Sequence, residues 1–356
     1  MTAPTDAARF EPGVRGGPEE ALLWIDRLAK TFRLGGARGD HGPGVIRAVD
    51  NVSFDVRKGE TFGLVGESGC GKSTLARCIL RLVQPTSGRV LLEGADLLGL
   101  GTTEMRRVRR RMQIVFQDPY ASLDPRMSAR GIVEEPLVIH GIGDREERRR
   151  RASEMLELVG ITPVQMTRKP HEFSGGQRQR IGVARALVLH PEVVILDEPI
   201  SALDVSIQAQ VLNLLRRLQE QLDLTYLFII HDLAVAEYFC DRVAVLYLGA
   251  VVELADREAI FRRPLHPYTV SLLSAVPIPD PASERRRQRI VLRGEVAPVS
   301  SEPRGCRFQP RCPVGRDRDV CRQQEPPLVE HAAGQWAACH FPGELAASRA
   351  ESETAA

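Results

Sequence analysis

The stretch of this sequence best suited to chemistry is GESGCGKST, which runs from Gly66 to Thr74 and matches the pattern G-x4-G-K-S/T. In such a loop the glycines allow backbone N–H groups to turn inward around phosphate oxygens. Lys72 then reaches the β- and γ-phosphates, and the Ser73 hydroxyl binds Mg²⁺. An ordinary glycine-rich turn is the alternative, but an apolar strand before the loop and a helical run after it argue against that. The sequence therefore predicts a nucleotide site made by Gly66, Glu67, Ser68, Gly69, Cys70, Gly71, Lys72, Ser73 and Thr74.

Two adjacent carboxylates, Asp197 and Glu198, end the apolar segment VVILDE. Ligands of open α/β sheets bind at the carboxyl ends of the strands. Asp197 is therefore suited to hold Mg²⁺, directly or through water, and Glu198 to polarise an attacking water molecule. Alone, such a pair would equally suit a solvated strand end. The phosphate loop in the same chain favours the catalytic interpretation.

A third polar motif, SGGQ at Ser174–Gln177, opens the helical run GGQRQRIGVARALVLH. The hydroxyl of Ser174 and the amides of Gly175 and Gly176 would form an anion site at the start of that helix. The alternative is a plain N-cap, which an isolated SGG would favour. Gln177 completes the motif.

Four of the seven cysteines lie close to the C-terminus with the spacing C-x5-C-x8-C-x17-C, namely Cys306, Cys312, Cys321 and Cys339. Thiols in a reducing compartment rarely form a disulfide framework, so the cysteine spacing favours metal binding. Four thiolates suit a 4Fe–4S cluster or zinc, and a tail without metal is the remaining alternative. The other three cysteines are expected to be packing residues: Cys70, Cys78 and Cys240.

The composition excludes some classes of protein. Lys plus Arg, 48, nearly balance Asp plus Glu, 46, so no global basic field marks a nucleic-acid binder. No apolar run reaches the roughly 18 residues that a membrane-spanning helix needs. Residues 1–20 are rich in Gly, Pro and charge and lack the apolar core of a signal peptide, so a disordered lead-in and a cytoplasmic location are expected.

The elements that must position these groups follow an α/β pattern. Apolar strand-length runs alternate with amphipathic segments from about Leu22 to Leu254, which predicts a mainly parallel central sheet. We expect a nucleotide-binding domain over residues 21–263, with a helical subdomain inserted at about 126–185 and an N-terminal β subdomain. A Cys-containing C-terminal extension would follow over 264–342, and a disordered tail over 343–356.

The order of the phosphate loop, SGGQ and VVILDE resembles the ATP-binding subunit of an ABC (ATP-binding cassette) transporter. Phe173 replaces the leucine that usually precedes the SGGQ motif. With that flank, HEFSGGQRQRIGVARAL, the segment LHPYTVSLLSAVPIPDP and the Cys tail resemble the oligopeptide and dipeptide importer branch. The resemblance implies the P-loop ATPase fold of ABC proteins and a 4Fe–4S cluster on the tail cysteines.

The resemblance also assigns roles to further residues. Gln117 matches the Q-loop glutamine that senses Mg²⁺ and the water, Asp204 the D-loop aspartate at the subunit interface, and His231 the switch histidine that contacts the γ-phosphate. The Ser174 motif would serve a nucleotide held by a second subunit. Phe32 is the candidate for stacking on adenine, and the alternatives are Phe10 and Trp24.

As a whole, the resemblance implies an ATPase subunit that drives peptide import with ATP and Mg²⁺. Its implied partners are an identical or homologous ATPase subunit, two transmembrane permeases and, through the complex, an extracytoplasmic solute-binding protein, with no nucleic acid. Its implied place is the cytoplasmic face of the plasma membrane, as a peripheral subunit. The alternatives are a soluble ABC ATPase acting on DNA or ribosomes, and an importer of nickel or another small solute.

Overall fold

A computed structural model describes residues 21–33, 45–277, 289–292 and 304–348 of the chain. The polypeptide divides into two compact units. The first unit contains residues 1–56, 62–98 and 230–356, and the second contains residues 57–61 and 99–229. The expected disordered lead-in, residues 1–20, lies outside the described residues, as does Phe10.

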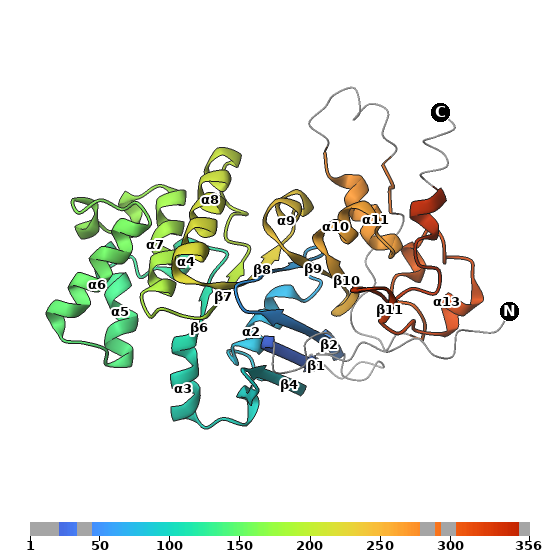
Figure 1. The fold of residues 1–356 in the computed structure, drawn as a ribbon, viewed down its shortest axis with the longest axis horizontal. Coiled ribbons are helices and arrows are strands. Elements are labelled where there is room, and N and C mark those ends of the chain that lie inside the picture. The colour runs from blue at the N-terminus through green and yellow to red at the C-terminus, as the bar shows by residue number, and fades with distance from the viewer. Residues whose placement is uncertain (1–20, 34–44, 278–288, 293–303, 349–356) are drawn as a thin grey trace, which may run out of the picture. The chain divides into compact units, whose positions relative to one another are not determined.

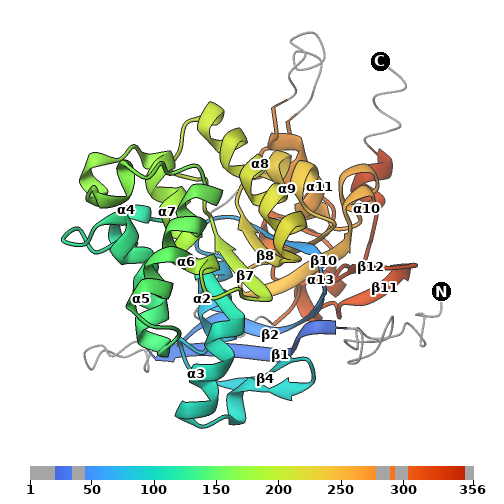
Figure 2. The same ribbon diagram turned by 60° about the vertical axis from the view of Figure 1, so that its left-hand side comes forward.

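The first unit carries a sheet in the strand order β2-β1-β4-β5, of which Figure 2 labels β2, β1 and β4. β1 pairs with β4 so that Ile25 lies opposite Val90, and the register shifts between Asp26 and Ala29. This sheet is the β subdomain that the sequence predicts. The bounds of its strands are β1 Ala21–Arg33, β2 Val45–Arg57, β4 Ser87–Leu92 and β5 Ala95–Asp96.

A second group of strands in the first unit begins with β3, the strand before the phosphate loop. β3 pairs in parallel with β9, and β9, β10, β12 and β11 continue as antiparallel neighbours. Figure 1 labels β9, β10 and β11 of this series. Every residue of β3 and β9 is buried, as expected for strands covered on both faces. The strand bounds are β3 Thr61–Val65, β9 Arg242–Tyr247, β10 Ala250–Asp256, β11 Val329–Ala332 and β12 Gln335–Ala337.

Helices among the described residues complete the first unit. α2 follows the phosphate loop, and α11 begins after His266, whose ring nitrogen Nδ1 accepts a hydrogen bond from the Tyr268 amide at 3.1 Å. Pro267 occupies the first turn of α11, where its missing N–H leaves no helical bond unmade. The helix bounds are α2 Lys72–Ile79, α9 Leu233–Phe239, α10 Arg257–Arg262, α11 Pro267–Ala275 and α13 Asp319–Gln323.

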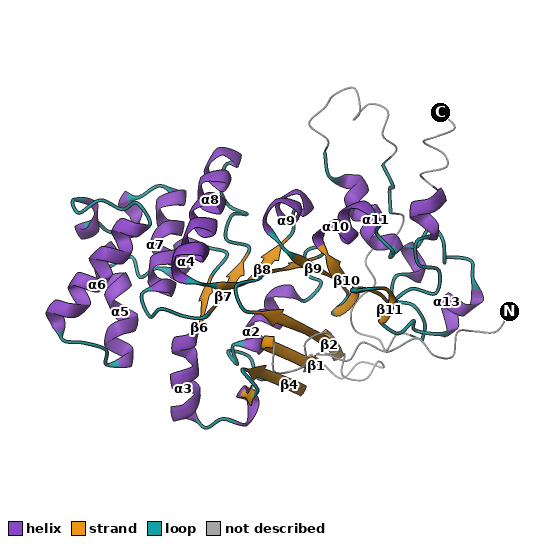
Figure 3. Cartoon of the chain, viewed as in Figure 1, coloured by secondary structure: helices purple, strands orange, loops and turns teal. Residues whose placement is uncertain are grey.

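The second unit combines three parallel strands with a helical region. β6, β7 and β8 pair in parallel in that order, and all of β7 and β8 is buried. Helices α5, α6 and α7 lie side by side (Figure 3), and α7 runs two residues beyond the expected range of about 126–185. The bounds are β6 Met112–Val115, β7 Val193–Asp197, β8 Thr225–Ile230, α3 Thr102–Arg111, α4 Pro119–Ser122, α5 Ala129–His140, α6 Arg145–Leu158, α7 Gly175–Leu187 and α8 Val205–Leu222.

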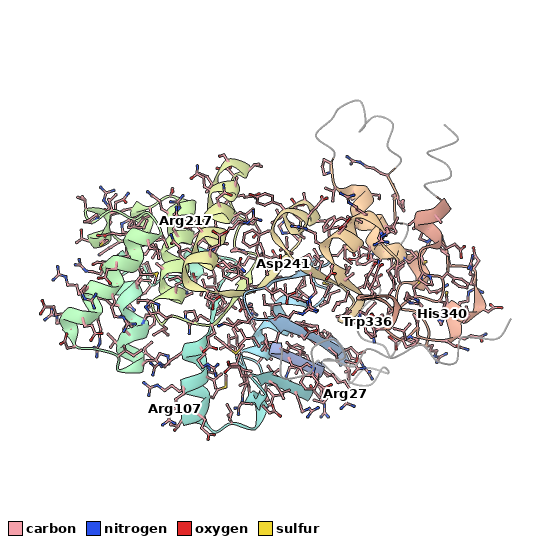
Figure 4. All side chains as sticks on the ribbon, viewed as in Figure 1. Arg27, Arg107, Arg217, Asp241, Trp336 and His340 are labelled. Carbon is pink, nitrogen blue, oxygen red and sulfur yellow. The ribbon has the colours of Figure 1, made fainter. Side chains whose placement is uncertain are left out.

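The C-terminal extension is built around the α13 helix and the β11–β12 hairpin, and Figure 4 marks Trp336 of β12 and His340 beyond it. Residues 344–348 form a short helix at the start of the range expected to be a disordered tail, and residues 349–356 lie outside the described part. Among the described residues, no helix is both long and apolar enough to cross a membrane.

Candidate nucleotide-binding site

The phosphate loop joins the end of β3 at Val65 to the start of α2 at Lys72. Gly71, the N-cap of α2, has φ 107°, and a Cβ there would lie 2.0 Å from the backbone oxygen of Ala48. A Cβ on Gly66 would similarly lie 2.3 Å from the backbone oxygen of Leu246. Only glycine lets the loop lie this close to neighbouring backbone. Two of the glycines in the motif are therefore required by the packing of the loop.

Lys72 places its cation inside this loop. Its Nζ donates hydrogen bonds to the carbonyl oxygens of Gly66 at 2.7 Å and Glu67 at 3.0 Å, and the residue is only 4% exposed. A buried ammonium group held on backbone oxygens at a helix N-terminus is placed to attract phosphate. Phosphate binding by Lys72 stays a prediction.

The phosphate-loop cysteine behaves as a packing residue. Cys70 is buried, and burial raises the pKa of its thiol although Lys72 opposes the shift. Cys78 and Cys240 are also buried. A Cβ on Gly63 would lie 2.7 Å from the Cys240 sulfur, so this thiol packs directly against β3. All three thiols lie in the core, as a packing role requires.

In the second unit, Gln117 and Glu198 are brought together. The Gln117 Nε2 donates a hydrogen bond of 2.8 Å to the Glu198 carboxylate. Gln117 follows β6 and Glu198 follows β7, and these parallel strands place both residues at the same sheet edge. Asp197 ends β7 with only 2% of its surface exposed.

The backbone at Glu198 is unusual. Its φ is 47°, a left-handed value that a residue with a side chain rarely adopts. The Glu198 amide donates to the carbonyl of Ile229 at 3.1 Å, and the Ser201 hydroxyl donates to the Glu198 carbonyl at 3.0 Å. These bonds fix the turn after β7, and local strain of this kind is concentrated at functional sites.

Ser174 is the N-cap of α7. Its hydroxyl accepts from the Gln177 amide at 3.3 Å, and the Gln177 side chain accepts from the Ser174 amide at 3.1 Å, which makes a capping box. A Cβ on Gly176 would lie 2.5 Å from the Ile207 side chain, so α7 and the start of α8 approach closely there. The plain N-cap alternative is therefore satisfied, and the exposed, positive end of the helix also suits an anion.

The remaining predicted residues lie apart from these groups in the chain. Asp204 is the N-cap of α8, His231 is exposed directly after β8, and Phe32 is a 39% exposed ring near the end of β1. The Lys30 ammonium lies 4.9 Å from the centre of that ring. Trp24, the alternative aromatic, is packed in β1 beneath the Arg89 guanidinium at 5.8 Å. Phe32 is the more accessible of the two for stacking on a base.

The four C-terminal cysteines are free thiols that influence one another. Burial raises the pKa of Cys306 to about 11 and that of Cys339 to about 12, and the neighbouring thiols contribute to both shifts. Gly315 lies between two of them, because a Cβ there would meet the sulfurs of Cys321 at 2.8 Å and Cys312 at 3.5 Å. In the described chain, no group of three or more His, Cys, Asp or Glu side chains is arranged as a metal site.

Sequence reasoning missed two residues beside the phosphate loop. Tyr268 accepts a hydrogen bond at its hydroxyl from the Glu67 amide at 3.0 Å, and Arg311 donates to the Glu67 carboxylate at 2.8 and 3.1 Å. Tyr268 belongs to the LHPY segment, which in the sequence indicates only a resemblance to the peptide-importer branch. Arg311 directly precedes Cys312, and no local pattern links it to a loop so far away in the chain.

A phosphate loop between a parallel strand and a helix, with carboxylates ending another parallel strand, defines a P-loop nucleotide-binding protein. The family described as ABC transporter matches residues 49–201, and the oligopeptide/dipeptide transporter C-terminal region matches residues 252–321. A protein of Sinorhizobium fredii described as a probable peptide ABC transporter ATP-binding protein is 51% identical over 329 residues, 92% of each chain. The chain belongs to the ATP-binding proteins of ABC transporters.

Further comparisons agree with this assignment. The oligopeptide transport ATP-binding protein of Bacillus subtilis is 48% identical over 324 residues, which cover 91% of this chain and 98% of the relative. A solved dimeric ATP-binding cassette in a post-hydrolysis state, bound to ADP and phosphate, is 32% identical with a TM-score of 0.58. It covers 66% of this chain and 98% of the solved one. These matches confirm the predicted fold class, the ABC-type ATPase and the resemblance to the peptide-importer branch.

Proposed function

We propose that this chain is the ATP-hydrolysing subunit of a peptide importer. The hydrogen bond between Gln117 and Glu198 is the observation that supports ATP hydrolysis. It holds a carboxylate at a strand end where a water molecule could be polarised. The relatives described as peptide import proteins, together with the matched C-terminal region, support peptides as the cargo.

Each residue then has a role. Lys72 binds the β- and γ-phosphates, while Ser73, Asp197 and Gln117 hold Mg²⁺, which neutralises phosphate charge when bound. Glu198 orients and polarises the water, and Gln117 fixes the Glu198 carboxylate. His231 contacts the γ-phosphate and Phe32 stacks on adenine, as the family resemblance implies. Asp204 would lie at the contact between two ATPase subunits.

The exposed α7 N-terminus supports a second role in a dimer. Ser174, Gly175 and Gly176 would contact the γ-phosphate of a nucleotide bound to a second ATPase subunit, identical or homologous, so that each chain supplies half of each site. The solved cassette similar to this chain is itself described as dimeric. The dimer would act on two permeases at the cytoplasmic face of the membrane, supplied by an extracytoplasmic solute-binding protein.

Transport by the reconstituted complex tests this function. The chain would be purified in complex with its permeases and solute-binding protein, placed in liposomes, and given labelled peptides or nickel with ATP. Peptide uptake that depends on ATP is expected. ATP-dependent nickel uptake without peptide uptake would show that the transported solute is nickel and not a peptide. ATPase activity stimulated by DNA or ribosomes, without any permease partner, would instead support the soluble alternative.

We also propose a 4Fe–4S cluster on Cys306, Cys312, Cys321 and Cys339. The four free thiols form a suitable donor set, because a bound cluster would stabilise their thiolate forms, and Cys312 and Cys321 both help to raise the pKa of Cys306 and of Cys339. The thiols would have to move to ligand geometry, since they do not form a metal site as they stand among the described residues. Iron and acid-labile sulfide in anaerobically purified protein would support the cluster, and zinc alone would refute it.

A further inference from the structure

Glu67, the second residue of the phosphate loop, is held by groups from outside the loop. Arg311 donates two hydrogen bonds to its carboxylate, from Nη1 at 2.8 Å and Nη2 at 3.1 Å. The Glu67 amide donates to the Tyr268 hydroxyl at 3.0 Å. Both partners belong to the segments after residue 263, so the C-terminal extension contacts the nucleotide loop at both the backbone and the side chain of one residue.

The Arg311 guanidinium also has neighbours other than Glu67. Its side chain is only 9% exposed, while that of Glu67 is 30% exposed, so the guanidinium is the more shielded member of the pair. The guanidinium also lies 5.9 Å from the ring centre of Tyr247, the last residue of β9. A planar guanidinium restrained in this way makes two hydrogen bonds of defined geometry to a carboxylate. A flexible ion pair on the surface does not.

An aromatic cluster anchors the base of this contact. The Phe308 ring lies 5.3 Å from that of Tyr247 and 5.4 Å from that of Tyr268, and the last two are 4.7 Å apart. Phe308 directly precedes the short helical turn Gln309–Arg311, and so positions the residue that grips the loop. Aromatic pairs at these separations contribute beyond the area they bury.

Glu67 passes this restraint on to the phosphate-binding lysine. Its carbonyl oxygen accepts from the Lys72 Nζ at 3.0 Å and from the Cys70 amide at 3.3 Å. Its amide, carboxylate and carbonyl therefore all have partners. A change at Arg311 or Tyr268 would reach Lys72 through this single residue.

We propose that Arg311 and Tyr268 are positioning residues for ATP, which hold the phosphate loop in its binding shape through Glu67. The extension thereby becomes part of the scaffold of the nucleotide site. The inference rests on the proposed function only in taking this loop as the ATP site. Neither residue needs to touch the nucleotide.

The test compares Arg311→Gln, Glu67→Gln and the double variant with the wild-type full chain. The control is Arg318→Gln, which removes a comparable two-pronged pair with Glu344 inside the same extension. Binding of a fluorescent ATP analogue and the KM and kcat for ATP would be measured. We expect each single variant to weaken binding about 10-fold, as for a charge-assisted bond, with kcat at saturating ATP nearly unchanged. The double variant should be no weaker than the singles, and the control should match wild type.

The outcomes separate this inference from the proposed function. If wild type fails to bind ATP, the proposed function fails. If wild type binds and the Arg311 and Glu67 variants lie within about twofold of it, or their effects add in the double variant, only the positioning role is refuted. If Arg311→Gln does not fold, Arg311→Lys is measured in its place. Lysine keeps the positive charge but cannot donate two parallel hydrogen bonds to the carboxylate, so its affinity for ATP should lie between that of wild type and a 10-fold loss.

Discussion

Replacing Gly71 by alanine would test whether the phosphate loop is fixed by its packing. At φ 107° a residue with a Cβ is strained, which costs about 1–2 kcal/mol. The new Cβ would also lie 2.0 Å from the Ala48 carbonyl oxygen, and a backbone atom cannot move aside as a side chain can. Overpacking adds about 1–3 kcal/mol. The free energy of unfolding should therefore fall by about 2–5 kcal/mol.

Gly69 in the same loop provides the matched control. Its φ is 79°, but a Cβ there would meet nothing within 4 Å. Gly69→Ala should cost only the conformational part, about 1–2 kcal/mol. Urea unfolding of the two variants without nucleotide measures the difference. Equal losses would show that the Ala48 contact does not restrain the loop, and would refute the packing argument.

Three further predictions follow from the described groups. Glu198→Gln should retain ATP binding and lose turnover by about 100-fold or more, since it keeps the shape but not the base; a phosphate-release assay showing normal turnover would remove Glu198 from that role. His266 is buried with its pKa lowered to about 3, so it stays neutral in the fold while the unfolded chain takes up a proton below about pH 6.5. Because of this group, the free energy of unfolding should fall by about 1.4 kcal/mol for each pH unit between pH 6.5 and pH 3. Urea unfolding of His266→Asn should show a smaller fall than wild type over the same range. In metal-free protein at pH 8, iodoacetamide should alkylate Cys306 about 100-fold more slowly than a thiol of ordinary pKa 9.0, and mass spectrometry showing the ordinary rate would contradict its raised pKa.

Local patterns in the sequence account for much of the site. The phosphate loop, the carboxylates after β7 and the helix start at Ser174 each lie within a few residues of the strand or helix that positions them. Periodicity and capping chemistry act over that range. The same reasoning extends to the α/β class and to the helical region between β6 and β7.

Other features depend on contacts between distant segments and left no local trace. Arg311 is separated from Glu67 by 244 positions, and only folding brings them together. The left-handed backbone at Glu198 is equally invisible in VVILDE, because the bond to Ile229 of the next strand stabilises it. For the cysteines, spacing indicates a ligand set but does not determine how the sulfurs lie relative to one another.

The hairpin of the extension also shields the core from self-association. β12 pairs with the side of β10 that β9 does not, at Glu253 and Leu254, so part of the outer edge of β10 is covered. The outermost strand at this end of the sheet is β11, which has four residues and includes Glu330 and an exposed His331. Short, polar edge strands resist pairing with other chains. A chain cut after residue 263 would expose the apolar flank of β10, and would be expected to aggregate rather than remain as a working smaller cassette.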